Sequence, residues 1–150
     1  MILKEYKTYF TEVLANLYPQ TEIDTFFFYL MGAYLDFRRI DLVLKADFEL
    51  STEVDMQFKK ALEALKKEIP IQYILGETEF YGLPFIVNRH TLIPRPETES
   101  LVAWILETAD TTAPLQIIDI GTGTGCIPIT LAKPLPKANL FAIDVSKEAL

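Results

Sequence analysis

The chain has 150 residues, carries a formal net charge of −7, and is 50% hydrophobic, which is enough for a packed core. An acidic surface gives no electrostatic footprint for phosphate, so direct nucleic-acid binding is disfavoured. The single cysteine, Cys126, cannot form an internal disulfide, and no metal-ligand cluster surrounds the only histidine, His90. No stretch reaches the ~18 apolar residues of a membrane span, and the N-terminus lacks an apolar signal region. We therefore expect a cytoplasmic protein without a metal or membrane contact.

Apolar residues recur at three- and four-residue steps through residues 1–70, which is the pattern of amphipathic helices. Three longer helices and a short one around residues 39–45 are predicted, and together they indicate a small helical bundle. The aromatic run at residues 26–29 is read as core, with a partner-binding face as the alternative; Phe28 falls off the stripe. The residues expected to face inward are Leu3, Tyr6, Phe10, Val13, Leu14, Leu17, Ile23, Phe26, Phe27, Leu30, Tyr34, Leu35, Val54, Phe58, Leu62, Leu65 and Ile69.

The ends of these helices are marked by prolines and by small polar residues. Pro19 is expected to end the first helix, and Thr21 is expected to cap the second with Asp24 as its capping-box partner. Ser51 is predicted to cap the last helix of the bundle, and Pro70 to stop it.

Residues 71–93 change character. Two strand-like runs, at 76–81 and 84–87, flank Gly82, which predicts a β-hairpin. After it comes an extended block with two prolines, and Pro96 suits the first turn of a following helix.

A glycine-rich turn dominates the C-terminal part of the sequence. Residues 116–120 form an apolar run typical of a strand buried on both faces of a parallel sheet. The run continues into Gly121-Thr122-Gly123-Thr124-Gly125 and then into a short apolar helix over residues 126–132. Strand, glycine turn and helix form the first half of a nucleotide-binding βαβ unit.

A second apolar run, residues 140–144, ends on Asp144, which follows Asp119 by 25 residues. An acid at the tip of the second strand of such a unit is placed to accept hydrogen bonds from ribose hydroxyls, at an expected spacing of about 20 residues. The two halves support each other, and favour a bound ligand over an ordinary strand–glycine–helix turn without one.

The spacing of the glycines indicates which nucleotide is bound. A dinucleotide site uses G-x-G-x-x-G with a pyrophosphate at the helix start, whereas this turn reads G-x-G-x-G and has Cys126 at the next position. The carboxylate of Asp119 suits a cationic amino-acid group better than a pyrophosphate. These features resemble motif I of the S-adenosylmethionine-dependent methyltransferases and disfavour an NAD site.

Four separated segments together resemble a more specific family. In this order they are similar to the protein-(glutamine-N5) methyltransferases of the HemK/PrmC family, over that family's N-terminal half. The proline–arginine–proline–acid block joined to the glycine turn is more specific than the turn alone. The segments are residues 70–76, 80–85, 92–99 and 119–127.

The resemblance implies a fold that is multidomain, α and α/β. It consists of a helical substrate-recognition bundle at 1–70, a β-hairpin linker at 71–93, and at 94–150 the incomplete start of a Rossmann-like, S-adenosylmethionine-dependent methyltransferase domain.

The resemblance also implies that S-adenosylmethionine is the cofactor. In this cofactor site the glycine turn would cradle the methionine and adenosyl parts, Asp144 would hold the ribose, and Asp119 would lie near the methionyl amino group. Arg95, Glu97 and Thr98 would close one wall, although a capped helix start with a surface ion pair also explains Arg95 and Glu97. The implied cofactor-binding residues are Arg95, Glu97, Thr98, Asp119, Gly121, Thr122, Gly123, Thr124, Gly125 and Asp144.

The family methylates the side-chain amide nitrogen of the glutamine in the GGQ motif of peptide chain release factors, which would be the protein partners here. A glutamine amide is a poor nucleophile, and in this family an Asn-Pro-Pro-Tyr segment orients it. That segment is absent from these 150 residues, so no catalytic residue is assigned and the chain is expected to be a fragment that is inactive alone. Two parallel strands would then leave their apolar faces open.

Two other functions share most of these features. The chain could belong to a ribosomal-protein glutamine methyltransferase, or it could be a non-catalytic docking module for a release factor or ribosomal protein. A pull-down with release factors, with and without residues 1–70, would separate the enzyme from the docking module, and titration with S-adenosylhomocysteine against NAD would test for a dinucleotide site.

Overall fold

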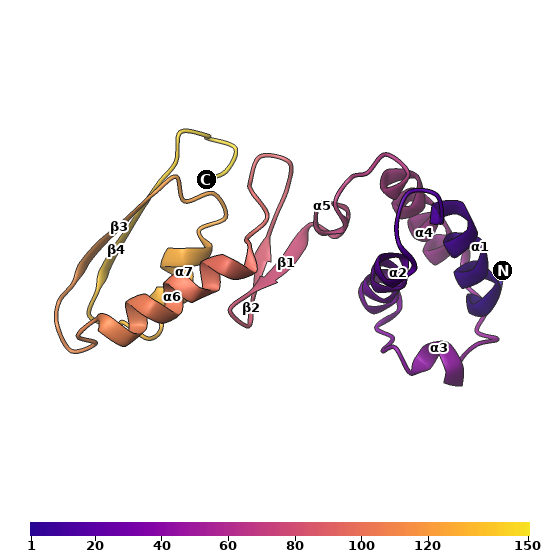
Figure 1. Cartoon of the computed structure of the whole chain (residues 1–150), viewed down its shortest axis with the longest axis horizontal. Coiled ribbons are helices and arrows are strands. Elements are labelled where there is room, and N and C mark those ends of the chain that lie inside the picture. Colours follow the sequence, from indigo (N-terminus) through magenta and orange to yellow (C-terminus); the bar gives the residue numbers. More distant parts are fainter. The chain divides into compact units, whose positions relative to one another are not determined.

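The computed structural model describes all residues, 1–150, and divides into two compact units, Met1–Leu75 and Gly76–Leu150 (Figure 1). Helices make up the first unit, apart from one isolated bridge between Ile2 and Glu49. The second unit contains two helices and two separate two-stranded sheets. The chain therefore combines a helical unit with a unit of mixed helix and small sheets.

The helical unit is held together by one apolar core to which every long helix contributes. Aromatic rings meet edge to face at its centre, with ring centroids 5.2 Å apart for Tyr6 and Phe58 and 5.3 Å apart for Phe10 and Phe27. Most of the predicted inward residues are buried, but Leu17 and Ile69 are exposed because their helices end before they reach them. The helices are α1 (Leu3–Leu14), α2 (Gln20–Leu35), α3 (Asp41–Leu44), α4 (Thr52–Leu65) and α5 (Ile71–Leu75).

The helix starts agree with the sequence at α4 and differ at α2. The Ser51 hydroxyl accepts the Val54 N–H at 3.3 Å, so the predicted cap of α4 is confirmed. The capping box at Thr21 is wrong, because α2 begins at Gln20 with Pro19 as its N-cap. Proline fits there because its fixed φ suits the extended cap residue, and its missing N–H has no partner to lose.

The aromatic run at residues 26–29 is divided by the helix into an inner and an outer side. Phe26 and Phe27 are buried, whereas Tyr29 is 53% exposed. Phe28 is partly buried against the core, and the Arg39 guanidinium lies 4.7 Å from its ring centroid. The core interpretation of this run therefore describes three of its four rings.

The short helix α5 was not predicted. Its first residue, Ile71, is buried in the core of the bundle, and the helix packs on α2 and α4. Pro70 precedes it, and the Pro70 carbonyl accepts the N–H of Tyr73 at 3.0 Å. Because α4 already ends at Leu65, the prediction that Pro70 stops it is wrong; Pro70 instead precedes α5, and the first compact unit extends to Leu75.

The hairpin of the second unit is the one expected. Strands β1 (Glu77–Phe80) and β2 (Leu83–Ile86) pair antiparallel, with Phe80 opposite Leu83. Tyr81 and Gly82 between them have φ of 52° and 73°. Positive φ at both central residues is the pattern of the tight turn that matches the twist of paired strands. Helix α6 (Pro96–Thr108) then begins with Pro96 in its first turn, as predicted.

The remaining elements form a parallel βαβ arrangement. Strands β3 (Gln116–Ile120) and β4 (Asn139–Ile143) pair in parallel, and α7 (Cys126–Ala132) connects them. Helix α7 contacts both strands and α6. The core on this side of the sheet contains Phe80, Phe85, Val102, Cys126, Leu131 and Leu135, with Ile117 and Leu140 packed against it.

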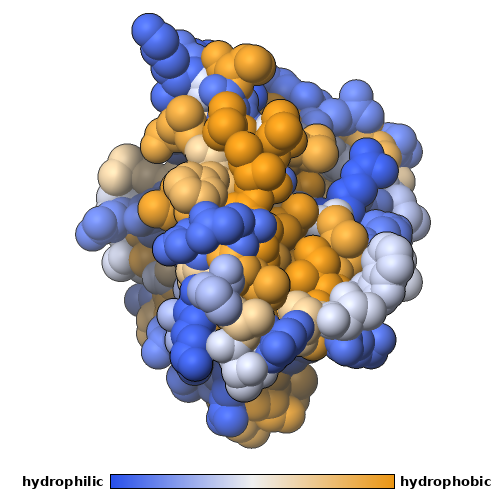
Figure 2. Space-filling view, turned by 90° about the vertical axis from the view of Figure 1, so that its left-hand side faces the viewer, coloured by the Kyte–Doolittle hydropathy of each residue, from blue (hydrophilic) through white to orange (hydrophobic).

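Burial of β3 and β4 on both faces, which the sequence predicts, is wrong for this chain. The side chains that alternate away from α7 are exposed: Ile118 by 55%, Ile120 by 77%, Phe141 by 52% and Ile143 by 49%. Figure 2 shows a broad hydrophobic area on the side where β3 and β4 lie in Figure 1. The expectation that two strands alone leave an apolar face open is confirmed.

Candidate functional site

The turn between β3 and α7 is a backbone structure that requires glycine. Gly121, Gly123 and Gly125 have φ of 80°, 54° and 71°. A Cβ at Gly121 or Gly123 would meet no atom within 4 Å, so conformation rather than crowding excludes other residues there. At Gly125 a Cβ would also meet Ile129 Cδ1 at 3.1 Å.

The turn is tied to the end of β4. The N–H groups of Gly121 and Thr122 both donate to the carbonyl oxygen of Ile143, at 2.7 and 3.1 Å. The next residue, Asp144, accepts the Gly123 N–H on Oδ2 at 2.8 Å and the Ser146 N–H on Oδ1 at 2.9 Å. The pKa of Asp144 is lowered by the Ser146 hydrogen bond first and the Gly123 hydrogen bond second. Asp144 therefore bridges the glycine turn and the residues that follow β4.

Asp119, the second predicted carboxylate, is held by a side chain rather than by backbone. The Thr122 hydroxyl donates to Asp119 Oδ2 at 2.7 Å, and Thr122 is buried. Asp119 is half-buried at the end of β3 and has no ion-pair partner within 4 Å. Its Oδ1 atom has no hydrogen bond within the chain, so it can accept one from a ligand.

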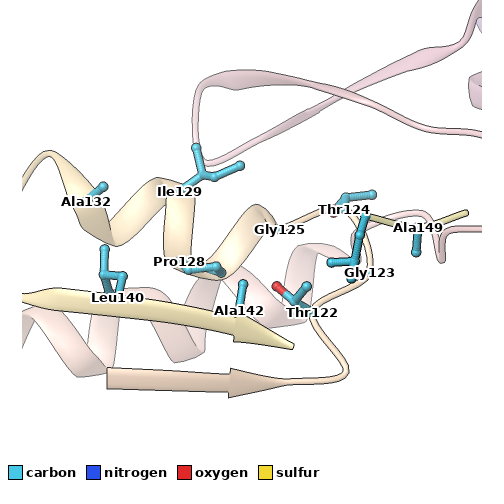
Figure 3. A pocket seen from close by; sticks show the side chains of 11 residues that line it. Thr122, Gly123, Thr124, Gly125, Pro128, Ile129, Ala132, Leu140, Ala142 and Ala149 are labelled. Atoms are coloured by element: carbon cyan, nitrogen blue, oxygen red, sulfur yellow. The ribbon is translucent and has the colours of Figure 1, made fainter. Parts of the chain in front are cut away.

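A pocket of about 390 Å³ opens beside the turn (Figure 3). Its size lies within the range of sites that bind small molecules. In Figure 3, the side chains of Leu140 and Ala142 point from β4 toward α7. The lining residues are Thr122, Gly123, Thr124, Gly125, Pro128, Ile129, Ala132, Leu140, Ala142, Ala149 and Leu150.

The sequence-predicted residues divide into two groups. Four residues of the turn, Thr122 to Gly125, line the pocket, whereas Gly121, Asp119 and Asp144 do not. The two acids are hydrogen-bonded to the turn. Sequence reasoning missed the apolar wall from α7 and β4. Two signals pointed to it: the four-residue spacing of Pro128 and Ala132 on a helix, and the alternation of Leu140 and Ala142 on a strand.

Arg95, Glu97 and Thr98 do not line this pocket. Arg95 is the N-cap residue of α6, and its carbonyl accepts the Thr98 N–H at 3.0 Å. No ion pair joins Arg95 to Glu97. The role of these three residues at a cofactor site stays a prediction.

Glu99, in the first turn of α6, connects this helix to the hairpin. Its Oε1 atom accepts the N–H of Tyr81 at 2.7 Å. Because Tyr81 has positive φ, this hydrogen bond holds a strained residue in place. The first turn of α6 is thereby fixed to the β1–β2 turn.

The structure contains no group of three or more His, Cys, Asp or Glu residues that could hold a metal ion. The one cysteine, Cys126, is buried in the core of the second unit. None of the helices combines the length and apolar character that a membrane crossing demands.

Comparisons with known proteins identify the helical unit. Residues 6–76 match the family model described as PrmC N-terminal domain. The release factor glutamine methyltransferase of Flavobacterium psychrophilum is 50% identical over 153 residues, which cover 100% of this chain and 54% of that protein. The protein of the same name from Bacteroides thetaiotaomicron is 37% identical over 142 residues, covering 95% of this chain and 50% of its own length. In Enterococcus faecalis the identity is 50% over 102 residues, covering 68% of this chain and 36% of that protein.

These matches show a chain that has a PrmC-type helical domain at residues 6–76 and that is similar over its whole length to a release factor glutamine methyltransferase. The chain belongs to the HemK/PrmC family, so the resemblance inferred from the motifs is confirmed. It spans about half the length of the two relatives that match it nearly throughout.

Proposed function

We propose that the chain is the N-terminal part of an S-adenosylmethionine-dependent methyltransferase that modifies the glutamine amide nitrogen in the GGQ motif of peptide chain release factors. The single observation that carries this proposal is the match over the whole chain to a release factor glutamine methyltransferase. Because that match covers 54% of the relative, the activity is proposed for the whole protein and not for these residues alone. We place it in the cytoplasm, where translation termination occurs.

The two compact units support a division of labour. We assign substrate recognition to the bundle at 1–70, a linking role to the hairpin region at 71–93, and the start of a Rossmann-like methyltransferase domain to 94–150. The parallel pairing of β3 with β4 across α7 supports the last assignment, because a parallel pair with a helical crossover is the repeating unit of such domains. The bundle would select release factors by shape, without direct contact to nucleic acid or membrane.

The residues present fit S-adenosylmethionine, whose sulfonium carries the methyl group that is transferred. The turn has open space at Gly121 and Gly123, so a ligand can approach the backbone there. Asp144 would accept hydrogen bonds from ribose hydroxyls, since its two oxygens have further lone pairs beyond the two backbone hydrogen bonds. The free Oδ1 of Asp119 would receive the ammonium group of the methionyl end.

The chemistry requires more than a bound cofactor. The lone pair of a glutamine amide is delocalised into its carbonyl, so the nitrogen must be held in line with the methyl group and its hydrogens must be accepted. We assign no catalytic residue within these 150 residues. Their contribution is to bind and orient the cofactor and to present the protein substrate.

Calorimetric titration of the chain with S-adenosylhomocysteine tests the cofactor assignment, with NAD as the comparison ligand. We expect S-adenosylhomocysteine to bind and NAD not to bind. The reverse preference would contradict the proposal and favour a dinucleotide site. The variant Asp144→Ala supplies the control, because it removes the proposed ribose acceptor and should abolish most of the binding.

The docking-module alternative is supported by the helical unit, which forms a compact body with its own core. It predicts that the chain retains a release factor on a column and has no affinity for S-adenosylhomocysteine. Comparing retention of a release factor with retention of ribosomal proteins distinguishes the two substrate classes.

A further inference from the structure

We propose that Thr122 is a positioning residue that prepares Asp119 for the amino-acid end of the cofactor. Its hydroxyl occupies one carboxylate oxygen, Oδ2, and leaves Oδ1 for the ligand's ammonium group. This inference rests on the proposed binding of an S-adenosylmethionine-type cofactor. It gives Thr122 a role different from direct contact with the ligand.

The first support is the geometry of the pair. The Thr122 hydroxyl donates to Asp119 Oδ2 at 2.7 Å, and the structure gives the Asp119 carboxylate no other hydrogen bond. The last torsion of an aspartate side chain is broad, so a free carboxylate samples many orientations. One short hydrogen bond to one oxygen restricts that rotation and fixes the direction of the other oxygen.

The second support is that Thr122 itself is immobilised. Its N–H donates to the Ile143 carbonyl at 3.1 Å, and its own carbonyl accepts the Gly125 N–H at 2.9 Å. The residue is only 7% exposed. The hydroxyl is therefore held by β4 on one side and by the glycine turn on the other, and it can support Asp119 without reorganising when a ligand arrives.

The third support is electrostatic. Asp119 has no cationic side chain within ion-pair distance and remains partly exposed at the end of β3. A carboxylate that is oriented but not neutralised favours a cation supplied by a ligand. An ammonium group on a zwitterionic amino-acid end has that chemistry, whereas the nucleoside end of the same ligand has none of it.

Thr130 provides a matched control. It is buried in α7 and does not line the pocket, and its hydroxyl has no hydrogen-bond partner. The substitutions Thr122→Val and Thr130→Val are chemically identical, and both keep the branched shape of the side chain. Only the first removes the hydrogen bond to Asp119.

The experiment compares two ligands on the 150-residue chain. S-adenosylhomocysteine carries the amino-acid end, and methylthioadenosine has the same nucleoside without it. We expect Thr122→Val to raise the Kd of S-adenosylhomocysteine about tenfold, which is typical for losing one charge-assisted hydrogen bond. The Kd of methylthioadenosine should not change. Thr122→Ser should restore the wild-type ratio of the two affinities, and Thr130→Val should not alter it.

A double-mutant cycle assigns the effect to the pair. In an Asp119→Asn background, Thr122→Val should have no further effect on the ratio, because the anion that it positions is gone. If Thr122→Val does not fold, Thr122→Ala is compared with Thr122→Ser for the same two ligands. Thr122→Ala should then lower the affinity for S-adenosylhomocysteine relative to methylthioadenosine, and Thr122→Ser should not. Equal weakening of both ligands, or no weakening of either, would overturn the inference while the cofactor assignment stands. Failure of the wild-type chain to bind S-adenosylhomocysteine would overturn both.

Discussion

The carboxylate of Asp144 accepts the backbone N–H of Gly123 at 2.8 Å, across a sequence separation of 21 residues. The same side chain accepts the Ser146 N–H on its other oxygen. The acid predicted to hold a ribose is thus also a structural part of the turn predicted to hold the rest of the cofactor. Under the proposed ribose contact, ligand binding would therefore be coupled to the conformation of the turn through one side chain.

The substitution Asp144→Asn should loosen the glycine turn. An asparagine can accept with one oxygen only, and its NH₂ group would face one of the two N–H donors that the carboxylate satisfies. We expect the Gly123 amide to exchange its hydrogen faster than in the wild type, by about tenfold or more. Amide exchange followed by NMR measures this directly.

Asp110→Asn is the matched control for that measurement. Asp110 also caps an exposed turn, where its Oδ1 accepts the N–H and the hydroxyl of Thr112 at 2.9 and 2.7 Å. Its replacement should accelerate exchange at Thr112 and leave Gly123 unchanged. Unaltered exchange at Gly123 in Asp144→Asn would show that the turn keeps its shape without the carboxylate.

The sequence predicted the turn and both acids because glycine spacing and strand ends are local signals. It could not predict that Thr122 turns toward Asp119, since that depends on backbone angles at three glycines with positive φ. The apolar wall from α7 and β4 was missed for a related reason. Its residues are ordinary small or aliphatic side chains, which acquire a role only when α7 packs against β4, the strand that follows it in the sequence.

Replacing Phe27 by alanine should remove a large part of the bundle's free energy of unfolding. Phe27 is fully buried and its ring meets those of Phe10 and Phe58 at centroid distances of 5.3 and 5.7 Å. Truncating a buried phenylalanine typically costs about 3–5 kcal/mol of unfolding free energy. Urea unfolding followed by circular dichroism at helix wavelengths measures the loss.

Tyr29→Ala is the control, because Tyr29 is in the same aromatic run and on the same helix but is 53% exposed. We expect it to change the unfolding free energy by less than about 1 kcal/mol. Similar losses for the two variants would contradict the assignment of Phe27 to the core and Tyr29 to the surface.

The helix faces of the bundle were predictable because burial follows the 3.6-residue period, which is written in the sequence. The helix starts were less so. Thr21 and Asp24 have the composition of a capping box, yet the N-cap of α2 is Pro19, two residues earlier, and Asp24 instead pairs with Lys7 of α1. A contact with another helix therefore decides the use of a side chain that local rules would assign to a cap. The helix α5 was missed because a five-residue helix carries no period that a sequence can display.

The Lys7–Asp24 pair should make bundle stability depend on acid pH. Lys7 Nζ also donates to Thr11 and lies 5.2 Å from the centroid of the Phe27 ring. The hydrogen bond from Lys7 is the main cause that lowers the pKa of Asp24 below its ordinary value of 3.8. Asp24→Asn should cost about 0.5–1 kcal/mol at neutral pH, a small value because Asp24 is partly exposed.

The sign of the pH effect follows from the lowered pKa. The stabilisation is fully present above the pKa of Asp24 in the unfolded chain and is lost as the pH falls through the lower pKa of the folded state. The difference in unfolding free energy between wild type and Asp24→Asn should therefore be constant from pH 5 to 8, a range that begins about one unit above the unfolded-state pKa of Asp24. The difference should shrink as the pH falls below that range. Asp47→Asn, at an exposed residue without an ion pair, should show no such difference.

The open face of the β3–β4 sheet should make the folded chain bind a hydrophobic dye. Ile118, Ile120, Phe141 and Ile143 form a contiguous apolar surface, because alternate residues on two paired strands share a face. Exposed patches of this kind mark surfaces that another element or molecule covers. We expect the fluorescent dye ANS to bind under native conditions, and the double variant Ile120→Thr with Phe141→Thr to lose most of that binding.

The same double variant should keep the unfolding free energy within about 1 kcal/mol of the wild type, because side chains that are half exposed or more contribute little burial. Leu131→Thr is the contrasting change, since Leu131 is fully buried on the opposite side of the sheet. It should destabilise the second unit by about 2–5 kcal/mol and increase dye binding rather than reduce it. Undiminished dye binding by the double variant would mean that the dye binds to a different surface. It would also mean that some part of the chain covers the sheet face in solution.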